Sequence, residues 1–317
     1  MMSYFYMILL TILFSFGGIT IKTSGTAFTP FMLSFLRFAI GVLLLVIIAL
    51  VREHRISLHF ADKIILMGGI AKAVNYLLEN YGVMKGFSFG NVIVWPVQAV
   101  VALAVSRFLF QEKVTARSVA GAILCVIGII TVSLNGTPLG EIRGEQASLL
   151  AVFVVSGIGA ALFTISQKML IGKVGAVEAN LSMFLVGSVI CLVAVLFTDR
   201  TAQAASSVIS AAPTLSAASA SPGISGIPGI IGPVTGPVLV SISMLGGITG
   251  VGFLLQAAAL KKIPIFMVTV IQSSTVILSL VWAVLFFHEP VTRYIVAGTL
   301  VFFMGILLVN IKGKSRG

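Results

Sequence analysis

Apolar stretches of about 20 residues follow one another along almost the whole chain, separated by short polar segments. About 20 apolar residues in helical conformation cross the hydrocarbon core of a bilayer, whereas the strands of a membrane barrel alternate over about 10 residues. The pattern therefore predicts an all-α integral membrane protein with ten transmembrane helices. The predicted spans are 4–22, 31–51, 64–85, 90–110, 117–134, 147–169, 179–198, 237–260, 265–287 and 294–311.

The composition agrees with this class, because 58% of the residues are hydrophobic and only 9% are charged. A soluble domain carries about 25% charged residues, so membrane lipid is the expected surrounding. The net charge of +11 comes with no basic amphipathic helix or aromatic–basic motif, and we expect no nucleic-acid partner. The basic residues concentrate in alternate loops, which predicts an inner-membrane protein with both termini in the cytoplasm.

One segment, 199–236, departs from the pattern of long apolar stretches. It is rich in Ala, Ser, Gly and Pro and carries no charge after Arg200. Because Pro and Gly interrupt helices, we predict a flexible, low-complexity loop on the outer side. A re-entrant segment near residues 224–231 is the alternative.

The chain repeats itself at one constant offset, without gaps. Residues 110–115, Phe-Gln-Glu-Lys-Val-Thr, align with residues 287–292, Phe-His-Glu-Pro-Val-Thr. Further along, the Val-Ala-Gly of 119–121 aligns with that of 296–298. An ungapped register over this distance indicates that the second half is a copy of the first.

The repeat predicts two related halves, 1–135 and 147–311, with five spans each. Because five is odd, the second copy enters the membrane from the opposite side. Inverted repeats of this kind are typical of secondary transporters, in which they provide two comparable states for alternating access.

Short motifs in both halves resemble the signatures of the drug/metabolite transporter superfamily, EamA type. The residues that carry the resemblance are Thr29-Pro30, Leu36-Arg37-Phe38, Glu112-Lys-Val-Thr115 with Gly121 and Gly128, and Glu289-Pro-Val-Thr292 with Gly298 and Gly305. The resemblance implies two EamA repeats and the transport of amino acids, amines, sugars or other metabolites, commonly outward from bacterial cells. The second copy has Leu185 where the first has Arg37, so any role of Arg37 belongs to one half.

The paired Glu-x-Val-Thr turns have a structural interpretation and a gating one. Thr115 and Thr292 are expected to cap the helices that follow them. Glu112 and Glu289 are predicted at helix carboxyl ends, where a negative charge is unfavourable, so each needs a cation or free amides as partner. The sequence favours a structural role for these turns, and a role in gating remains the alternative.

The third span is the least apolar, since Lys72, Asn75, Tyr76 and Glu79 form one stripe along it. Ionisable side chains in a membrane are costly and are usually functional. Lys72 and Glu79 are about 10 Å apart along the helix axis, a distance at which they can flank a small zwitterion. The alternative is pairing with other helices for folding, for instance of Glu79 with Arg37. Burial favours the neutral form of a carboxyl group, so Glu79 is also the candidate for proton coupling.

Polar or helix-breaking residues occupy equivalent positions in the two halves. Trp95 and Pro96, which are predicted to interrupt the fourth span, correspond to Gln272 and Ser273 in the ninth span, and Glu79 corresponds to Gln256. Interrupted helices at matching positions point to a central binding site in transporters. We therefore predict that Glu79, Lys72, Asn75, Tyr76, Trp95, Gln256, Gln272 and Ser273 bind the substrate.

The sequence thus predicts a secondary transporter that moves a small polar metabolite, an amino acid, amine or similar compound, by alternating access. An exporter or a proton-coupled exchanger fits best. The alternatives are a non-transporting scaffold or accessory subunit and a membrane-embedded lipid-modifying enzyme. No metalloprotease, nucleophile-elbow or phosphate-loop motif occurs, and Cys125 and Cys191 lie in apolar segments, so we expect no enzyme activity, cofactor or metal. The oligomeric state stays open, with a homodimer as one option.

Overall fold

The computed structural model describes residues 2–52, 54–86, 93–111, 115–134, 136, 144–210, 228–288 and 291–310. In this part of the chain the regular secondary structure is helical throughout, so the protein has an all-helical membrane fold. The elements are α1 (Met2–Ser15), α2 (Gly17–Ser24), α3 (Pro30–Arg52), α4 (Lys63–Lys85), α5 (Val94–Phe108), α6 (Ala116–Leu134), α7 (Glu145–Leu170), α8 (Ala176–Ser210), α9 (Gly236–Gly247), the π-helical turn η3 (Ile248–Gly252), α10 (Phe253–Leu260), α11 (Ile265–Ser273), α12 (Thr275–Phe287) and α13 (Arg293–Asn310).

Six helical stretches in the described residues are long and apolar enough to cross a membrane. They are Met2–Ser24, Pro30–Arg52, Ala147–Leu170, Ala176–Thr198, Gly236–Leu260 and Ile265–Phe286. Helices α5, α6 and α13 contain shorter apolar segments. Helix α4 is 23 residues long but is not among the six, as its polar stripe leads us to expect.

Two of these stretches are broken where small polar residues cluster. The first changes direction at Phe16, next to Ser15, and the Ser15 hydroxyl donates to Ile12 O at 2.6 Å. Between α11 and α12 the break lies at Ser274, and Ser273 Oγ donates to Thr269 O at 2.9 Å. Serine hydroxyls that bond to carbonyls of the preceding turn compete with the helical ladder and bend helices. The sequence-based spans 4–22 and 265–287 treated each stretch as one continuous helix.

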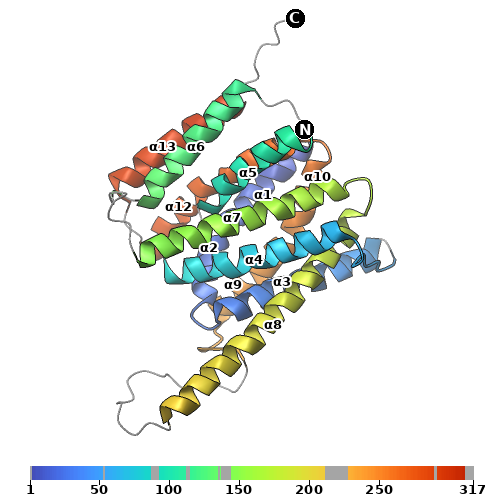
Figure 1. Cartoon of the computed structure of the whole chain (residues 1–317), viewed down its shortest axis with the longest axis vertical. Coiled ribbons are helices and arrows are strands. Elements are labelled where there is room, and N and C mark those ends of the chain that lie inside the picture. Colours follow the sequence, from blue (N-terminus) through green and yellow to red (C-terminus); the bar gives the residue numbers. More distant parts are fainter. Residues whose placement is uncertain are drawn as a thin grey trace, which may run out of the picture.

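Helix α8 corrects the predicted start of the outer loop. The sequence analysis ended the seventh span at residue 198 and began a loop at 199, but α8 continues to Ser210 and extends beyond the other helices (Figure 1). Residues 199–210 contain no Pro or Gly and three alanines, and alanine is the strongest helix former. The prediction gave too much weight to low complexity. Residues 211–227 of the predicted loop, which include half of the re-entrant alternative, lie outside the described residues.

The end of that predicted loop is fixed to the turn between α2 and α3. Thr29 N donates to Gly229 O at 2.9 Å, and Ile231 N donates to Ala27 O at 2.8 Å. These bonds join two segments that lie far apart in the sequence, one in each half of the chain. The loop therefore returns across the start of α3.

Helices α6 and α13 lie side by side along one flank of the bundle (Figure 1). Their contact is made through glycines at which the two backbones touch. A Cβ on Gly128 would lie 2.5 Å from Gly298 O, and a Cβ on Gly305 would lie 2.6 Å from Gly121 O. Small residues allow such close approach in lipid, where helix association depends on packing. The four glycines therefore lie where the two helices pack against each other.

Gly128→Ala is expected to destabilise the protein by about 1–3 kcal/mol, the usual cost of overpacking. The added Cβ would also lie 2.6 Å from Phe302 N, and backbone atoms cannot move aside as a flexible side chain does. Gly247→Ala is the matched control, because no atom lies within 4 Å of the Cβ position there. We expect thermal unfolding in detergent to begin at a lower temperature for Gly128→Ala than for Gly247→Ala. Equal unfolding temperatures would contradict the close contact.

Candidate functional site

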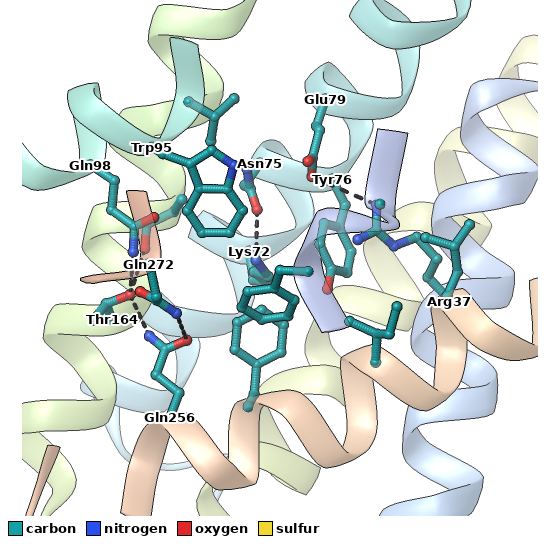
Figure 2. A pocket seen from close by; sticks show the side chains of 17 residues that line it. Arg37, Lys72, Asn75, Tyr76, Glu79, Trp95, Gln98, Thr164, Gln256 and Gln272 are labelled. Carbon is teal, nitrogen blue, oxygen red and sulfur yellow. Dashed lines mark hydrogen bonds and ion pairs between the residues drawn. The ribbon is translucent and has the colours of Figure 1, made fainter. Parts of the chain in front are cut away.

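A buried cavity lies between the helices, and residues from both halves of the chain line it (Figure 2). The centre of a water molecule can occupy about 30 Å³ of this cavity. That space holds about two waters. Seven of the eight predicted substrate-binding residues line it, namely Lys72, Asn75, Tyr76, Glu79, Trp95, Gln256 and Gln272. The eighth, Ser273, is buried in α11 and is not part of the lining.

Helix α4 brings four of these side chains to the cavity from one face. The spacing of Lys72, Asn75, Tyr76 and Glu79 places them within two turns of a helix on the same side. All four residues are buried. The helix begins with Asp62, whose carboxylate accepts from Ile64 N at 2.8 Å and satisfies one of the free amides of the first turn.

Arg37 of α3 contacts the end of this stripe that carries Glu79. Its Nη1 lies 3.6 Å from Glu79 Oε2 and donates to Asn80 Oδ1 at 2.9 Å. The guanidinium carbon stacks 3.6 Å from the centre of the Tyr76 ring. The ion pair that the sequence analysis gave as the alternative for Glu79 is therefore present, and it lies at one end of the cavity (Figure 2).

Lys72 lies in the middle of the cavity among aromatic rings. Its Nζ donates to Asn75 Oδ1 at 2.7 Å and lies 4.3 Å from the centre of the Tyr76 ring and 4.2 Å from that of Phe253. It makes no ion pair with any residue in the described ranges. Ring faces attract a cation, but more weakly than a carboxylate partner does in a dry site. Lys72 is therefore a buried ammonium group with donors to spare.

Asn75 is held so that its carbonyl oxygen faces Lys72. Its Nδ2 donates to Ser156 Oγ at 2.8 Å, and the Ser156 hydroxyl donates to the backbone oxygen of Asn75 at 3.0 Å. This reciprocal pair joins α4 to α7 and fixes which end of the amide is the acceptor. The position of the ammonium group is thus set by two helices.

The far end of the cavity consists of amide side chains around Thr164 of α7 (Figure 2). Gln98 Nε2 and Gln256 Nε2 donate to Thr164 Oγ1 at 2.9 and 2.8 Å, and Gln272 Nε2 donates to Gln256 Oε1 at 3.0 Å. The Oε1 atoms of Gln98 and Gln272 are buried and have no partner among the described residues. We refer to Gln98, Thr164, Gln256 and Gln272 as the amide cluster.

The sequence analysis missed half of the amide cluster. Neither Gln98 nor Thr164 is among the residues predicted to bind the substrate. A threonine in an apolar helix commonly bonds to the carbonyl four residues before it, as Thr164 does with Ala160 O at 3.0 Å. The signal for Gln98 was available, because an amide in a membrane helix needs a partner.

The cationic side chains that line the cavity outnumber the anionic ones. Arg37 and Lys72 are cations and Glu79 is an anion, so the net charge of the lining is +1 when all three are ionised. In a membrane interior such a field is weakly screened and favours a ligand with a negative group. The ionisable lining therefore points to an anionic or zwitterionic ligand over a simple cation.

Of the predicted turn residues, Thr115 and Thr292 are described, and neither lines the cavity. Thr115 Oγ1 accepts from Ser118 N at 3.2 Å, and Thr292 Oγ1 accepts from Ile295 N at 3.4 Å, which is the expected capping pattern. Glu112 and Glu289 lie outside the described residues. Within the described residues α5 begins at Val94, so Pro96 lies in its first turn, where no intrahelical amide bond is lost; residues 87–92 of the predicted fourth span lie outside the described residues.

The family model described as "EamA-like transporter family" matches this chain twice, over residues 1–134 and 147–311. The chain belongs to the EamA-like transporter family. A protein named "Uncharacterized transporter" from Archaeoglobus fulgidus is 25% identical to it over 185 residues, which are 57% of this chain. The match spans 64% of the length of that relative.

The fold of this EamA-like chain also occurs among solved structures. One structure, described only as the crystal structure of a protein, superposes with a TM-score of 0.72 over 98% of each chain. The two sequences are 12% identical, so the likeness shows the fold alone. The match includes both halves of the chain.

Proposed function

We propose that this EamA-like protein is a secondary transporter that moves a small polar metabolite across the inner membrane by alternating access, as an exporter or a proton-coupled exchanger. One observation carries the proposal: Arg37, Lys72 and Glu79 face a single buried cavity together with four amide side chains. Charges at membrane depth are costly and mark substrate or ion pathways. The cytoplasmic placement of both termini remains part of the proposal.

Contacts between α6 and α13 support two inverted halves. Gly121 is equivalent to Gly298 in the repeat, and Gly128 is equivalent to Gly305. Gly128 touches Gly298, and Gly305 touches Gly121, so exchanging the halves maps one contact onto the other. This is the arrangement expected around a pseudo-two-fold axis between inverted repeats.

A third contact lies on the same axis. Cys125 and Phe302 are equivalent in the repeat, and Cys125 Sγ lies 3.7 Å from Phe302 O. We therefore group the helices into ten spans, joining α1 with α2, α9 through η3 with α10, and α11 with α12. Each half then has five spans, and the cavity lies between the halves.

Transport through this cavity requires the helices to move apart. A space of about 30 Å³ is far smaller than an amino acid or a comparable metabolite. Both broken stretches contribute to the lining, through Phe14 and Gly17 on one side and Gln272 on the other. Breaks in spanning helices absorb the change of backbone angles in such motions, so we propose that these two stretches act as hinges.

Glu79→Gln is expected to remove the response of transport to a pH gradient. Protonation of Glu79 would release Arg37 from its ion pair, which couples proton binding to the charge of the cavity. Glutamine has no proton to exchange but keeps an acceptor for Arg37, so we expect the variant to fold. Uptake into proteoliposomes with and without a pH gradient measures the effect.

The matched control for this prediction is Glu178→Gln. Glu178 lies outside the cavity, beside His59 and Arg55 at distances of 3.4 and 3.8 Å. We expect its variant to keep the response to the gradient. Unchanged coupling in Glu79→Gln would remove Glu79 from the proton path and leave the substrate site in place.

The transport proposal is tested by efflux from proteoliposomes loaded with an extract of small polar metabolites. Mass spectrometry of the outside solution should show the selective loss of one compound or a few related compounds. Liposomes without protein control for leakage. Retention of every compound under both signs of the pH gradient and the membrane potential would favour the scaffold alternative. Chemical conversion of a lipid in the same vesicles would favour the enzyme.

A further inference from the structure

The direction of one hydroxyl group fixes the polarity of the whole amide cluster. Thr164 Oγ1 donates its only proton to Ala160 O, so it can only accept from other partners. Gln98 and Gln256 must therefore present their NH₂ groups to it. Gln256 Oε1 then accepts from Gln272 Nε2, and the carbonyl oxygens of Gln98 and Gln272 are left without partners among the described residues.

Two unpartnered carbonyl oxygens at one end of a cavity form an acceptor site. Gln98 is 3% exposed and Gln272 is 0% exposed, and both line the cavity. A buried acceptor without a hydrogen bond is unfavourable, so a ligand that brings N–H or O–H donors gains free energy there. When Arg37, Lys72 and Glu79 are all ionised the lining carries a net charge of +1, so a free cation gains less than a donor group attached to an anion.

Lys72 supplies hydrogen-bond donors, which complement the acceptor oxygens of the amide cluster. Its ammonium group has three donors and uses one of them for Asn75 within the described part of the chain. Glu79 is already engaged by Arg37, so the donor end of a ligand is drawn to the amide cluster rather than to Glu79. Figure 2 shows Lys72 between the amide cluster on one side and the Arg37–Glu79 pair on the other.

We infer that the cavity binds a small zwitterion of the α-amino-acid class in one orientation, with its carboxylate at Lys72 and its ammonium group at the carbonyl oxygens of Gln98 and Gln272. This inference rests on the proposed transport function and narrows its substrate class. Thr164 is a positioning residue, which acts by aiming the carbonyl oxygens of the amide cluster.

The test measures binding by the thermal stabilisation of purified protein in detergent. The probes are the proteinogenic amino acids, each with its decarboxylated amine and its deaminated carboxylic acid. At least one amino acid should stabilise the protein at a concentration about tenfold or more below that of both of its analogues, because each analogue lacks one charge-assisted hydrogen-bonding group. Equal binding of an amino acid and its deaminated acid would overturn the inference.

Variants assign each end of the ligand. The double variant Gln98→Leu/Gln272→Leu should bind the amino acid no better than its deaminated acid, because the acceptor oxygens are gone. Thr164→Val should act in the same direction, and Thr164→Ser should retain the wild-type preference. Gln167→Leu is the control for folding: Gln167 is a buried amide on α7 whose Oε1 is also unpartnered among the described residues, but it lies outside the cavity.

Failure of the inference is distinguishable from failure of the proposed function. If no amino acid binds while the efflux assay identifies another polar metabolite, the inferred amino-acid ligand is wrong and the proposed transport function is retained. If Gln98→Leu/Gln272→Leu keeps the wild-type preference for the amino acid over its deaminated acid, the amide cluster is not the ammonium site. If no compound is transported, both the inferred amino-acid ligand and the proposed transport function are wrong.

Discussion

Arg37→Leu is expected to destabilise the folded protein by about 3–5 kcal/mol, the cost of breaking a buried ion pair from one side. The substitution removes the Arg37 guanidinium from the Glu79 carboxylate and the Arg37 donor from Asn80 Oδ1. Both groups are at most 7% exposed, so bulk water has little access to them in the folded state. Thermal unfolding in detergent measures the effect.

A second substitution separates this mechanism from a general loss of packing. In the Arg37→Leu background, Glu79→Gln should raise the unfolding temperature, because it replaces a buried carboxylate whose ion pair with Arg37 is broken. Arg55→Leu is the surface control, since the Arg55 side chain is 75% exposed and its pair with Glu178 should contribute less than about 1 kcal/mol. If the double variant were no more stable than Arg37→Leu, the ion pair would not explain the loss.

Lys72→Met is expected to weaken substrate binding strongly without loss of stability. Methionine has a similar length and fits among the Tyr76, Phe163 and Phe253 rings, while the variant no longer buries an ammonium group that has no ion-pair partner in the described residues. The affinity for a zwitterion should fall by at least about tenfold, the effect of one hydrogen bond to a charged group.

Binding and unfolding are measured on the same Lys72→Met sample. The unfolding temperature without ligand should be no lower than that of the wild type, although Asn75 Oδ1 loses its donor. Ligand should no longer raise it at concentrations that stabilise the wild type. A large loss of stability with normal binding would mean that Lys72 serves the fold and not the ligand.

Hydropathy and the internal repeat were enough to predict seven of the residues that line the cavity. The helical spacing in 64–85 predicted that Lys72, Asn75 and Glu79 share a face, and they do. The constant offset between the two copies then added Gln256 and Gln272 from the second half, which line the same cavity. Both arguments succeed because they use periodicity, which depends on the backbone alone.

What the sequence analysis missed depends on contacts between distant segments. The unpartnered oxygen of Gln98 depends on Thr164 of α7 lying within hydrogen-bonding distance of Gln98 on α5 and Gln256 on α10, and this proximity is known only when the helices are packed together. Pro96 was assigned to the interior of a span that starts at residue 90, whereas α5 begins at Val94 in the described residues. Helix ends shift by a few residues in such analyses, and the role of a proline changes with the shift.

The most direct test of the central claim compares efflux rates in proteoliposomes for wild type, Gln98→Leu/Gln272→Leu and Gln167→Leu, using the compound that the wild type releases. All three proteins should be folded, as judged by their unfolding temperatures. We expect efflux through the cavity variant to fall at least about tenfold, and efflux through Gln167→Leu to remain near the wild-type rate. Equal rates for the wild type and the cavity variant would show that the metabolite does not pass through this cavity.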